Sequence, residues 1–265
     1  MGRLEYKYLI PNKFIEPIRA YFNPYLELDP YAINRPENQY TVRSIYYDTR
    51  NLDSYYNKLA GIRVRKKFRV RGYNQIDQDS LIFLEIKRKE VNVISKNRSP
   101  VEYKLLPALL KTGDYETFVY TNNGIPNPGE QAKPFLYFYN RRDLRPAIKI
   151  IYEREPFIYK FDSSLRITMD KNLRSSLEKS PETLGSESGV ISAIPGYFIL
   201  EIKTYKKYPK WLRYLIAELD TKHRALSKYT ICIDSHRKLG RQVQTIAHHS
   251  TVPEDFHDNG KEREP

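Results

Sequence analysis

Polar and apolar residues alternate over many short stretches of the chain, and this spacing is typical of β-strands that bury one face. Residues 62–71 show it most clearly, because every second residue is a cation and most residues between them are apolar. The cations of this stretch are Arg63, Arg65, Lys67, Arg69 and Arg71. Since residues two apart lie on one face of a strand, all five side chains are predicted to point the same way.

The same alternation, combined with helical spacing elsewhere, predicts a mixed α+β fold. The predicted strands are residues 3–10, 39–48, 62–71, 81–89, 147–156, 165–170 and 197–204. The predicted helices are residues 11–25, 51–60, 209–224 and part of 105–145.

The remaining segments have the composition of loops. Residues 122–129 are predicted to be an exposed loop, and residues 175–189 a mobile one. Lys96 and Arg98 are predicted to lie in a polar connection. No clean linker divides the chain, so we predict one domain over residues 1–240 and a disordered tail over residues 241–265.

The tripeptide Glu-x-Lys occurs four times, at residues 5–7, 85–87, 102–104 and 201–203. Each copy lies in or beside a predicted strand, so its carboxylate and its ammonium group share one face. Apolar neighbours occupy the other face, as Leu84 and Ile86 do around Glu85. The predicted sheet therefore has one charged and one apolar side.

Such strands can assemble in two ways. An open antiparallel sheet would leave its charged face in water. A closed antiparallel β-barrel would enclose the charged face in a tunnel, with flanking helices on its apolar exterior. The aligned cations favour the barrel, because like charges on one strand repel each other unless an anion lies between them.

The net charge of +13 indicates an anionic partner, although the last sixteen residues are acidic. Nucleic acid, an anionic membrane and phosphate-rich small molecules all have the required charge. A nucleic-acid interface would be expected to expose its cations among aromatic residues, whereas these cations alternate with apolar residues. We therefore predict no specific nucleic-acid partner.

Several other classes of protein are disfavoured by the sequence. No run approaches the roughly 20 apolar residues of a membrane helix, and the first residues lack the apolar core of a secretory signal, so a cytoplasmic location is predicted. The single cysteine, Cys232, excludes an internal disulfide, and the histidines lack zinc-site spacing. A P-loop NTPase is excluded because the chain has no Walker-type glycine-rich loop.

Eight short motifs follow one another in order between residues 3 and 235. They are Arg3-x-Glu5-x-Lys7-Tyr8, Tyr47-Asp48, Gly61-x-Arg63-x-Arg65, Leu84-Glu85-x-Lys87, Tyr152-x-Arg154-x-x-Phe157, Arg166-Ile167-x-x-Asp170, Leu200-Glu201-x-Lys203 and Ser227-Lys228-Tyr229. In this order they resemble the VTC domain, which is the polyphosphate polymerase module of the triphosphate tunnel metalloenzyme (CYTH-like) superfamily. Wider relatives of the adenylate cyclase and thiamine-triphosphatase type begin with Glu-x-Glu-x-Lys. Arg3 stands at their first Glu, which favours the VTC branch.

The resemblance implies a closed antiparallel barrel with a charged tunnel that binds triphosphate and a divalent metal, Mn²⁺ or Mg²⁺. It also implies an activity, transfer of the γ-phosphate of ATP or another triphosphate to a growing polyphosphate or pyrophosphate chain. A membrane-protein partner that the sequence does not reveal is left open.

Site residues follow from the resemblance and from their charge. The cations that would act on the reacting phosphates are Arg63, Arg65, Lys87, Arg154, Arg166, Lys203 and Lys228. Residues expected to bind the substrate are Lys7, Lys96, Tyr47, Tyr152 and Ser227. The candidate metal ligands are Glu201 first, then Glu5 and Glu85, because a carboxylate among many cations is well explained by a shared metal.

Structural interpretations stand beside these roles. Glu85 and Glu201 could form cross-strand salt bridges, and Tyr47 and Tyr152 could be packing residues. Lys67, Arg69 and Arg71 extend past the matched motif and are interpreted as a solvated rim that guides anions inward. Asp170 could orient a cation or cap a turn. A triphosphatase and a non-catalytic sensor remain alternatives to the polymerase.

Overall fold

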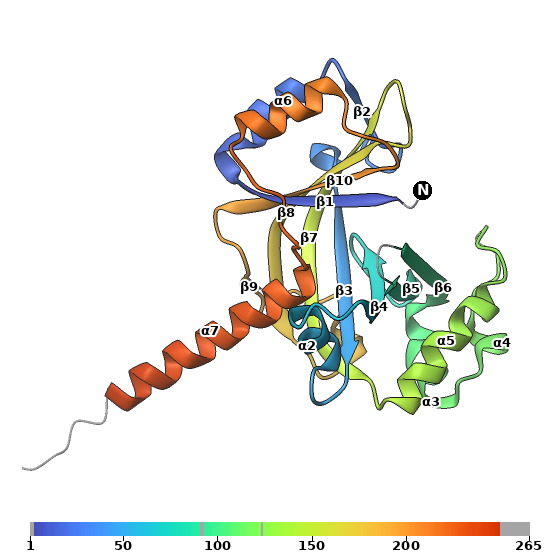
Figure 1. The fold of residues 1–265 in the computed structure, drawn as a ribbon. Coiled ribbons are helices and arrows are strands. Elements are labelled where there is room, and N and C mark those ends of the chain that lie inside the picture. The colour runs from blue at the N-terminus through green and yellow to red at the C-terminus, as the bar shows by residue number, and fades with distance from the viewer. Residues whose placement is uncertain (1–2, 91–92, 123, 250–265) are drawn as a thin grey trace, which may run out of the picture.

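A computed structural model describes residues 3–90, 93–122 and 124–249 of the chain. It is built on a ten-stranded sheet in which every pairing is antiparallel (Figure 1). The strands are β1 (Leu4–Pro11), β2 (Leu26–Leu28), β3 (Tyr40–Asp48), β4 (Val64–Tyr73), β5 (Leu81–Glu90), β6 (Val93–Glu102), β7 (Arg145–Tyr159), β8 (Arg166–Leu177), β9 (Ile191–Ser192) and β10 (Tyr197–Thr204). The helices are α1 (Ile15–Phe22), α2 (Asp53–Leu59), α3 (Leu106–Thr112), α4 (Tyr115–Phe118), α5 (Pro128–Arg141), α6 (Lys210–Glu218) and α7 (Lys228–His249). The predicted mixed α+β class is confirmed.

The sheet is not closed by backbone hydrogen bonds among the described residues. Its strands run in the order β1, β10, β8, β7, β3, β4, β5, β6, with β2 beside β7 and β9 beside β8, and β1 and β6 stand at the two ends. The closed barrel of the prediction is therefore replaced by a strongly curled sheet. Side chains bring β1 and β5 together, since the Lys87 ammonium donates to Glu5 at 3.1 Å.

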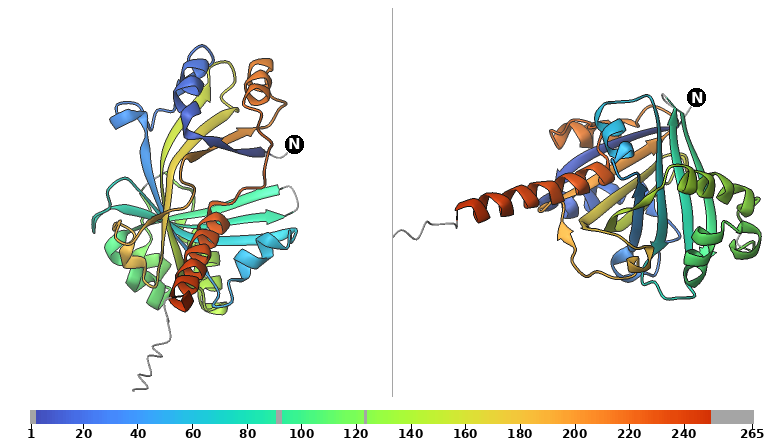
Figure 2. Two further views of the ribbon diagram at one scale, coloured as in Figure 1. Left: turned by 90° about the vertical axis from the view of Figure 1, so that its left-hand side faces the viewer. Right: turned by 90° about the horizontal axis from the view of Figure 1, so that it is seen from below.

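Alternation along the strands separates a charged inner face from apolar outer faces. The outer face of β4 and β5 packs against α3 and α5 through Phe68, Leu84 and Phe135. The outer face of β1, β8 and β10 packs against α1 and α6, and Figure 2 shows these two helices on the same side of the molecule. The helices thus cover the apolar exterior, as the sequence predicted.

The first turns of α7 enter the concave side of the sheet. Tyr229, Cys232 and Ile233 pack there against Val42, Ile150 and other apolar residues of β3, β7 and β8. The rest of α7 runs away from the sheet (Figure 1). The chain is helical as far as His249, where a disordered tail from residue 241 was predicted, and residues 250–265 of that tail lie outside the described residues.

Two predicted connections differ in the structure. Lys96 and Arg98 lie within strand β6 instead of a polar connection. The segment predicted to be a mobile loop, 175–189, begins inside β8 and is then tied to the sheet by ion pairs. The buried Lys149 pairs with Glu178 at 2.8 Å, and Glu187 pairs with Arg43 at 2.5 Å and with Arg174 at 3.0 Å.

Tyr47, predicted to bind substrate, lies in the outer core and has no access to the inner face. It is 1% exposed and its ring packs against Phe135 and Tyr139. Its neighbour Tyr46 faces inward instead, and the register of β3 with β7 shifts between the two tyrosines. The packing interpretation of Tyr47 is therefore the correct one.

Tyr47→Phe is predicted to raise the free energy of unfolding by up to about 1 kcal/mol, because the buried Tyr47 hydroxyl has no hydrogen-bond partner among the described residues. The matched change Tyr229→Phe should lower it by about 1.5–3 kcal/mol, since that hydroxyl donates to the Asp48 carboxylate at 2.6 Å. Urea denaturation of both variants measures the difference. Equal losses in the two variants would contradict this account of Tyr47.

Candidate functional site

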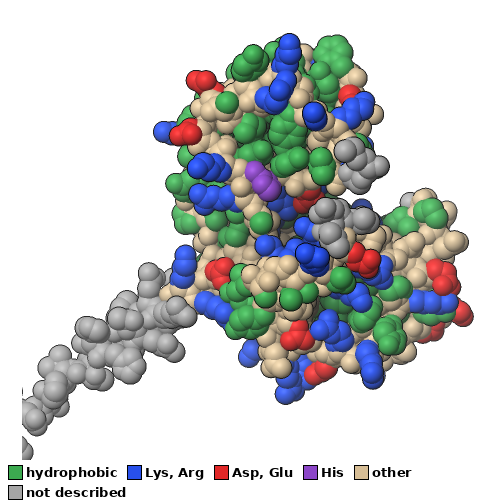
Figure 3. All heavy atoms as spheres, in the orientation of Figure 1, with side chains coloured by type: hydrophobic (Ala, Val, Ile, Leu, Met, Phe, Trp, Pro, Cys, Tyr) green, Lys and Arg blue, Asp and Glu red, His purple; other side chains and the backbone are tan. Residues whose placement is uncertain are grey.

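The concave side of the sheet holds a cavity of about 360 Å³ that is strongly basic. Its side chains come from six strands, from α2, from the segment that leads into α7 and from the first residues of α7. The cations around it are Lys7, Lys58, Arg65, Lys67, Arg69, Arg71, Lys87, Lys89, Arg154, Lys203, Arg224 and Lys228, against two carboxylates, Glu5 and Glu201. Figure 3 shows blue side chains gathered in the hollow between the upper and lower halves of the molecule.

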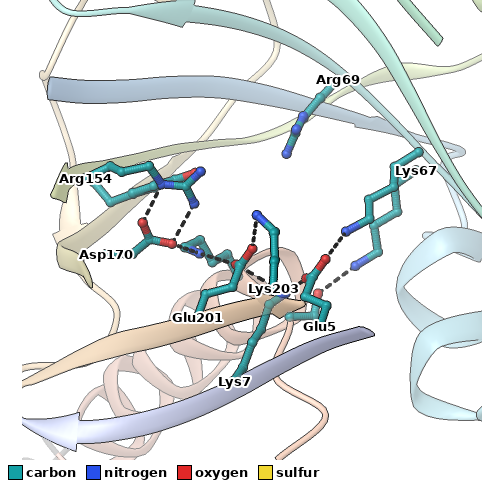
Figure 4. Close-up of polar contacts among 12 residues, drawn as sticks. Glu5, Lys7, Lys67, Arg69, Arg154, Asp170, Glu201 and Lys203 are labelled. Atoms are coloured by element: carbon teal, nitrogen blue, oxygen red, sulfur yellow. Dashed lines mark hydrogen bonds and ion pairs between the residues drawn. The ribbon is translucent and has the colours of Figure 1, made fainter. Parts of the chain in front are cut away.

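Glu201 lies at the centre of the cavity floor, on β10. It is 5% exposed and forms an ion pair with Lys203, while the ammonium groups of Lys7 and Lys228 lie 3.7 and 3.9 Å from its Oε2 (Figure 4). Burial opposes ionisation of Glu201, but these cations outweigh it and hold the pKa of Glu201 well below its ordinary value. The carboxylate is therefore ionised at neutral pH.

Glu5 lies on the neighbouring strand β1 and shares Lys7 with Glu201. The Lys7 ammonium is 2.7 Å from Glu5, and Lys87 approaches Glu5 from β5 at 3.1 Å. Burial and the charge of Glu201 raise the pKa of Glu5, yet Lys7 and Lys87 lower it more, so that it falls to about 2. Although burial disfavours its charge, Lys7 has a raised pKa because of these two carboxylates.

Asp170, on β8, orients two cations of the wall. It is fully buried and accepts two hydrogen bonds from the Arg154 guanidinium, at 2.7 and 2.8 Å, and one from Lys228 at 2.5 Å (Figure 4). This is the cation-orienting role that the sequence left open for Asp170. The bidentate contact fixes the plane of Arg154, so its free N–H edge faces the cavity in one orientation.

The β4 cations have different partners. Arg69 pairs with Glu85 at 2.6 Å and donates to the Tyr46 hydroxyl at 2.9 Å. Lys67, two residues away, donates to the Ser227 hydroxyl at 2.6 Å and has no carboxylate within 4 Å among the described residues. Burial, followed by the repulsion of Lys7 and Lys87, lowers the pKa of Lys67 well below its ordinary value.

Most of the residues proposed from the sequence meet in this cavity. Those that line it are Arg65, Lys87, Arg154, Lys203, Lys228, Lys7, Tyr152, Ser227, Glu201 and Glu5. Their individual chemical roles stay predictions.

Four further candidates besides Tyr47 lie outside the cavity, namely Arg63, Arg166, Lys96 and Glu85. Arg63 is exposed and precedes the first residue of β4. Arg166 stands opposite Lys203 in the sheet, but its side chain is half-exposed and its nearest carboxylate is Asp29, at 3.9 Å. Lys96, on β6, pairs with Glu85 at 2.6 Å.

Glu85, proposed as a metal ligand, is a structural ion-pair centre. It is 1% exposed and is surrounded by Arg69, Lys96, Arg98 and Arg71 at 2.6 to 3.9 Å. The cross-strand salt bridges expected for Glu85 are thus formed, and its place outside the cavity disfavours it as a ligand of a metal shared with phosphate.

Several lining residues were not assigned to the site from the sequence. Lys67, Arg69 and Arg71, interpreted as a solvated rim, line the cavity itself, and their unbroken alternation with Arg65 was the signal that could have assigned them. Lys89 continues the inner face of β5 in the same way. Lys58 and Arg224 come from a helix and an irregular segment, so no periodicity marks them.

The carboxylates of the cavity suit a metal ion that is shared with phosphate. Among the described residues, no cluster of three or more His, Cys, Asp or Glu side chains forms a protein-only metal site. Mg²⁺ and Mn²⁺ in phosphate-binding proteins commonly take one or two carboxylates together with phosphate oxygens. Glu201 and Glu5 supply such a pair, on neighbouring strands and bridged by Lys7.

A family model described as the VTC domain matches residues 2–237, which confirms the resemblance drawn from the motifs. A relative in Schizosaccharomyces pombe, the vacuolar transporter chaperone complex subunit 4, is 25% identical over 248 residues. The match covers 79% of this chain and 34% of that protein, so the chain spans about a third of the length of its relative.

Two solved structures are also similar to the chain. A putative adenylyl cyclase from Hippeastrum, whose title reports a dominant triphosphatase activity, matches with a TM-score of 0.44 and 10% identity, over 97% of this chain and all of that one. The PH1819 protein from Pyrococcus horikoshii matches with a TM-score of 0.42 and 13% identity, over 86% of this chain and 97% of the other.

Lys67→Met is predicted to stabilise the protein without ligand by about 0.5–2 kcal/mol at neutral pH, because it removes a buried ammonium group that has no carboxylate within 4 Å in the described part of the chain. The folded-state pKa of Lys67 is depressed, so the cost is fully present below that pKa. It then shrinks as the pH rises toward the ordinary value of 10.5. Urea denaturation of both proteins across this pH range should show their difference shrinking; a constant or growing difference would contradict the assignment.

Proposed function

The chain belongs to the VTC domain family, and on this premise we propose that it is an ATP- and divalent-metal-dependent polyphosphate polymerase. It would transfer the γ-phosphate of ATP to the end of a polyphosphate chain inside the basic cavity. The observation that carries the proposal is the enclosure of twelve cations around two ionised carboxylates. A surface with so uneven a charge balance is suited to a ligand with several negative charges and a metal ion.

Phosphoryl transfer asks little covalent chemistry of a protein. It requires that the transferred phosphate lie in line with the attacking oxygen and that the negative charge around it be neutralised. Arg154 suits the first need, because Asp170 fixes its orientation before substrate arrives. Lys203 and Lys228 supply positive charge beside it, and the hydroxyl of Tyr152 is held within the same wall.

Glu201 and Glu5 are the residues that would hold the metal. Mn²⁺ or Mg²⁺ would neutralise phosphate charge and orient the triphosphate when it is bound. Lys203 and Lys7 now contact these carboxylates. When phosphate enters, the same ammonium groups can turn to phosphate oxygens, so the cavity changes partners without burying a new unpaired charge.

The relative's name suggests assembly into a larger complex, and the short overlap leaves the other parts of that protein unmatched. A membrane-protein partner therefore stays a prediction for this chain, as does its cytoplasmic location. No helix among residues 3–90, 93–122 and 124–249 is both long and apolar enough to cross a bilayer.

The proposal is tested by incubating the purified chain with ATP, Mn²⁺ and a trace of pyrophosphate, followed by separation of the products on a gel. A ladder of polyphosphate with release of ADP is expected. Free phosphate without a ladder would indicate a triphosphatase, in which water replaces the acceptor. Tight triphosphate binding without either product would indicate a sensor.

Glu201→Gln is predicted to lower metal-dependent turnover by at least about a hundredfold, because it removes the buried charge that would hold the metal. Glu187→Gln is the matched control, since Glu187 pairs with Arg43 and Arg174 away from the cavity. Its turnover should stay within about twofold of the unmodified chain. Initial rates at several Mn²⁺ concentrations check both, and unchanged turnover of Glu201→Gln would remove Glu201 as the metal ligand.

A further inference from the structure

The cations of the cavity fall into two groups that differ in their partners. The first group contacts carboxylates, and we call it the acid-paired group: Lys7, Arg69, Arg71, Lys87, Arg154, Lys203 and Lys228. The second group has no carboxylate within 4 Å among the described residues, and we call it the acid-free mouth: Lys58, Arg65, Lys67, Lys89 and Arg224. The two groups share one cavity but differ in electrostatic character.

The acid-free mouth is assembled from three separate parts of the fold. Arg65 and Lys67 come from β4, and Lys89 stands directly opposite Arg65 on β5. Lys58 comes from the last turn of α2, and Arg224 from the segment before α7, where its backbone N–H donates to the carbonyl of Lys7. The nearest acid on β5, Glu90, stands opposite Val64 on the other face of the strand.

The mouth reaches the surface at Arg224, which is exposed. Lys58, Arg65 and Lys89 are half-buried, as most of the acid-paired cations are, whereas the ammonium group of Lys67 is buried. Burial, followed by the repulsion of Arg65 and Lys89, lowers the pKa of Lys58. Gathering cations in this way destabilises the empty protein, so the arrangement is best explained by an anion that lies among them.

We propose that the acid-free mouth is a separate, metal-independent site for the body of a polyphosphate chain. The metal-bound triphosphate occupies the acid-paired group instead. This inference rests on the proposed function, because it divides the cavity between the two phosphate substrates of that reaction. The terminal phosphate of the chain would reach inward toward Arg154 and Lys203, and the phosphates behind it would follow the mouth outward.

The division follows from what each ligand needs. A nucleoside triphosphate with its metal ion needs carboxylates to hold the metal. Glu5 and Glu201 form their ion pairs with cations of the acid-paired group. A polyphosphate chain without a tightly held metal needs cations alone, and carboxylates would repel it. Product can also slide through such a mouth, since lysine and arginine contacts to phosphate are alike at every repeat of the chain.

Nucleic acid fits the mouth less well. Single-stranded nucleic acid binds through base stacking on accessible aromatic rings in addition to phosphate contacts. The tyrosines of the cavity, Tyr46, Tyr152 and Tyr229, are each at most 8% exposed. The exposed ring of His223 lies beside Arg224, but it packs edge-on against Tyr6 and Tyr8. The cavity lining among the described residues therefore lacks a row of accessible rings on which successive bases could stack, and an unbranched inorganic chain is favoured.

The test measures binding, so it does not depend on turnover. A double variant, Lys58→Ala with Lys89→Ala, is compared with a control of equal charge loss, Lys111→Ala with Lys210→Ala, which changes two exposed lysines on α3 and α6. Each protein is titrated with medium-length polyphosphate in EDTA, and separately with inorganic triphosphate in Mn²⁺. Thermal unfolding without ligand verifies that both variants are folded.

The mouth variant is expected to bind polyphosphate in EDTA at least about tenfold more weakly, while its affinity for triphosphate with Mn²⁺ changes less than about twofold. The control variant should keep nearly unchanged affinities for polyphosphate in EDTA and for triphosphate with Mn²⁺. Equal losses for both ligands would overturn the proposal in favour of one undivided site, and no loss for polyphosphate would overturn the mouth as a site. An oligonucleotide of equal charge that competes as well as polyphosphate would also overturn it.

The outcome for the mouth is independent of the outcome for the activity. An absent ladder in the ATP assay refutes the polymerase, whereas EDTA-resistant binding that depends on Lys58 and Lys89 still supports a polyphosphate site. The converse result is also informative. A polyphosphate ladder in the ATP assay supports the polymerase, and an unchanged affinity of the mouth variant for polyphosphate in EDTA overturns the division of the cavity.

Discussion

Mutual repulsion among cations on one concave face is the constraint on which the rest of this structure depends. Twelve lysines and arginines surround a cavity of about 360 Å³, and water screens those that are partly buried less than it would on an open surface. Asp170 and Glu201, both buried on the floor, hold the wall together by pairing with Arg154, Lys228 and Lys203. The outer helices supply the apolar packing that keeps this face curled inward.

The inner face was predictable from the sequence because a strand has a strict period of two. The alternation that begins before Arg65 assigns Lys67, Arg69 and Arg71 to one face, and the Glu-x-Lys copies at Glu5 and Glu201 do the same for β1 and β10. Antiparallel pairing then brings these faces together. Closure of the sheet was not predictable, since it depends on which edge strands meet, and here a side-chain contact joins β1 to β5 instead of a ladder.

Alternation fails where the backbone or a neighbour breaks it. Tyr46 and Tyr47 are adjacent and chemically alike, so only the register shift between them decides which faces the cavity. Glu85 has the predicted inward direction, but cations on β4 and β6 occupy its carboxylate. Lys58 and Arg224 are the opposite case, because a helix end and an irregular segment bring them to the site through contacts that no local pattern encodes.

Carboxylates offset the repulsion among cations at the floor of the cavity but not at the acid-free mouth. This difference has a thermodynamic consequence. Where carboxylates are present, the empty cavity is balanced and an arriving anion must compete with them. Where they are absent, around Lys67 and Lys58, the empty protein is destabilised and an arriving anion relieves repulsion that already exists. Ligand binding and folding are therefore linked most strongly at the mouth. Selection for a polyanion there would work against the stability of the empty fold, which the three apolar clusters must supply.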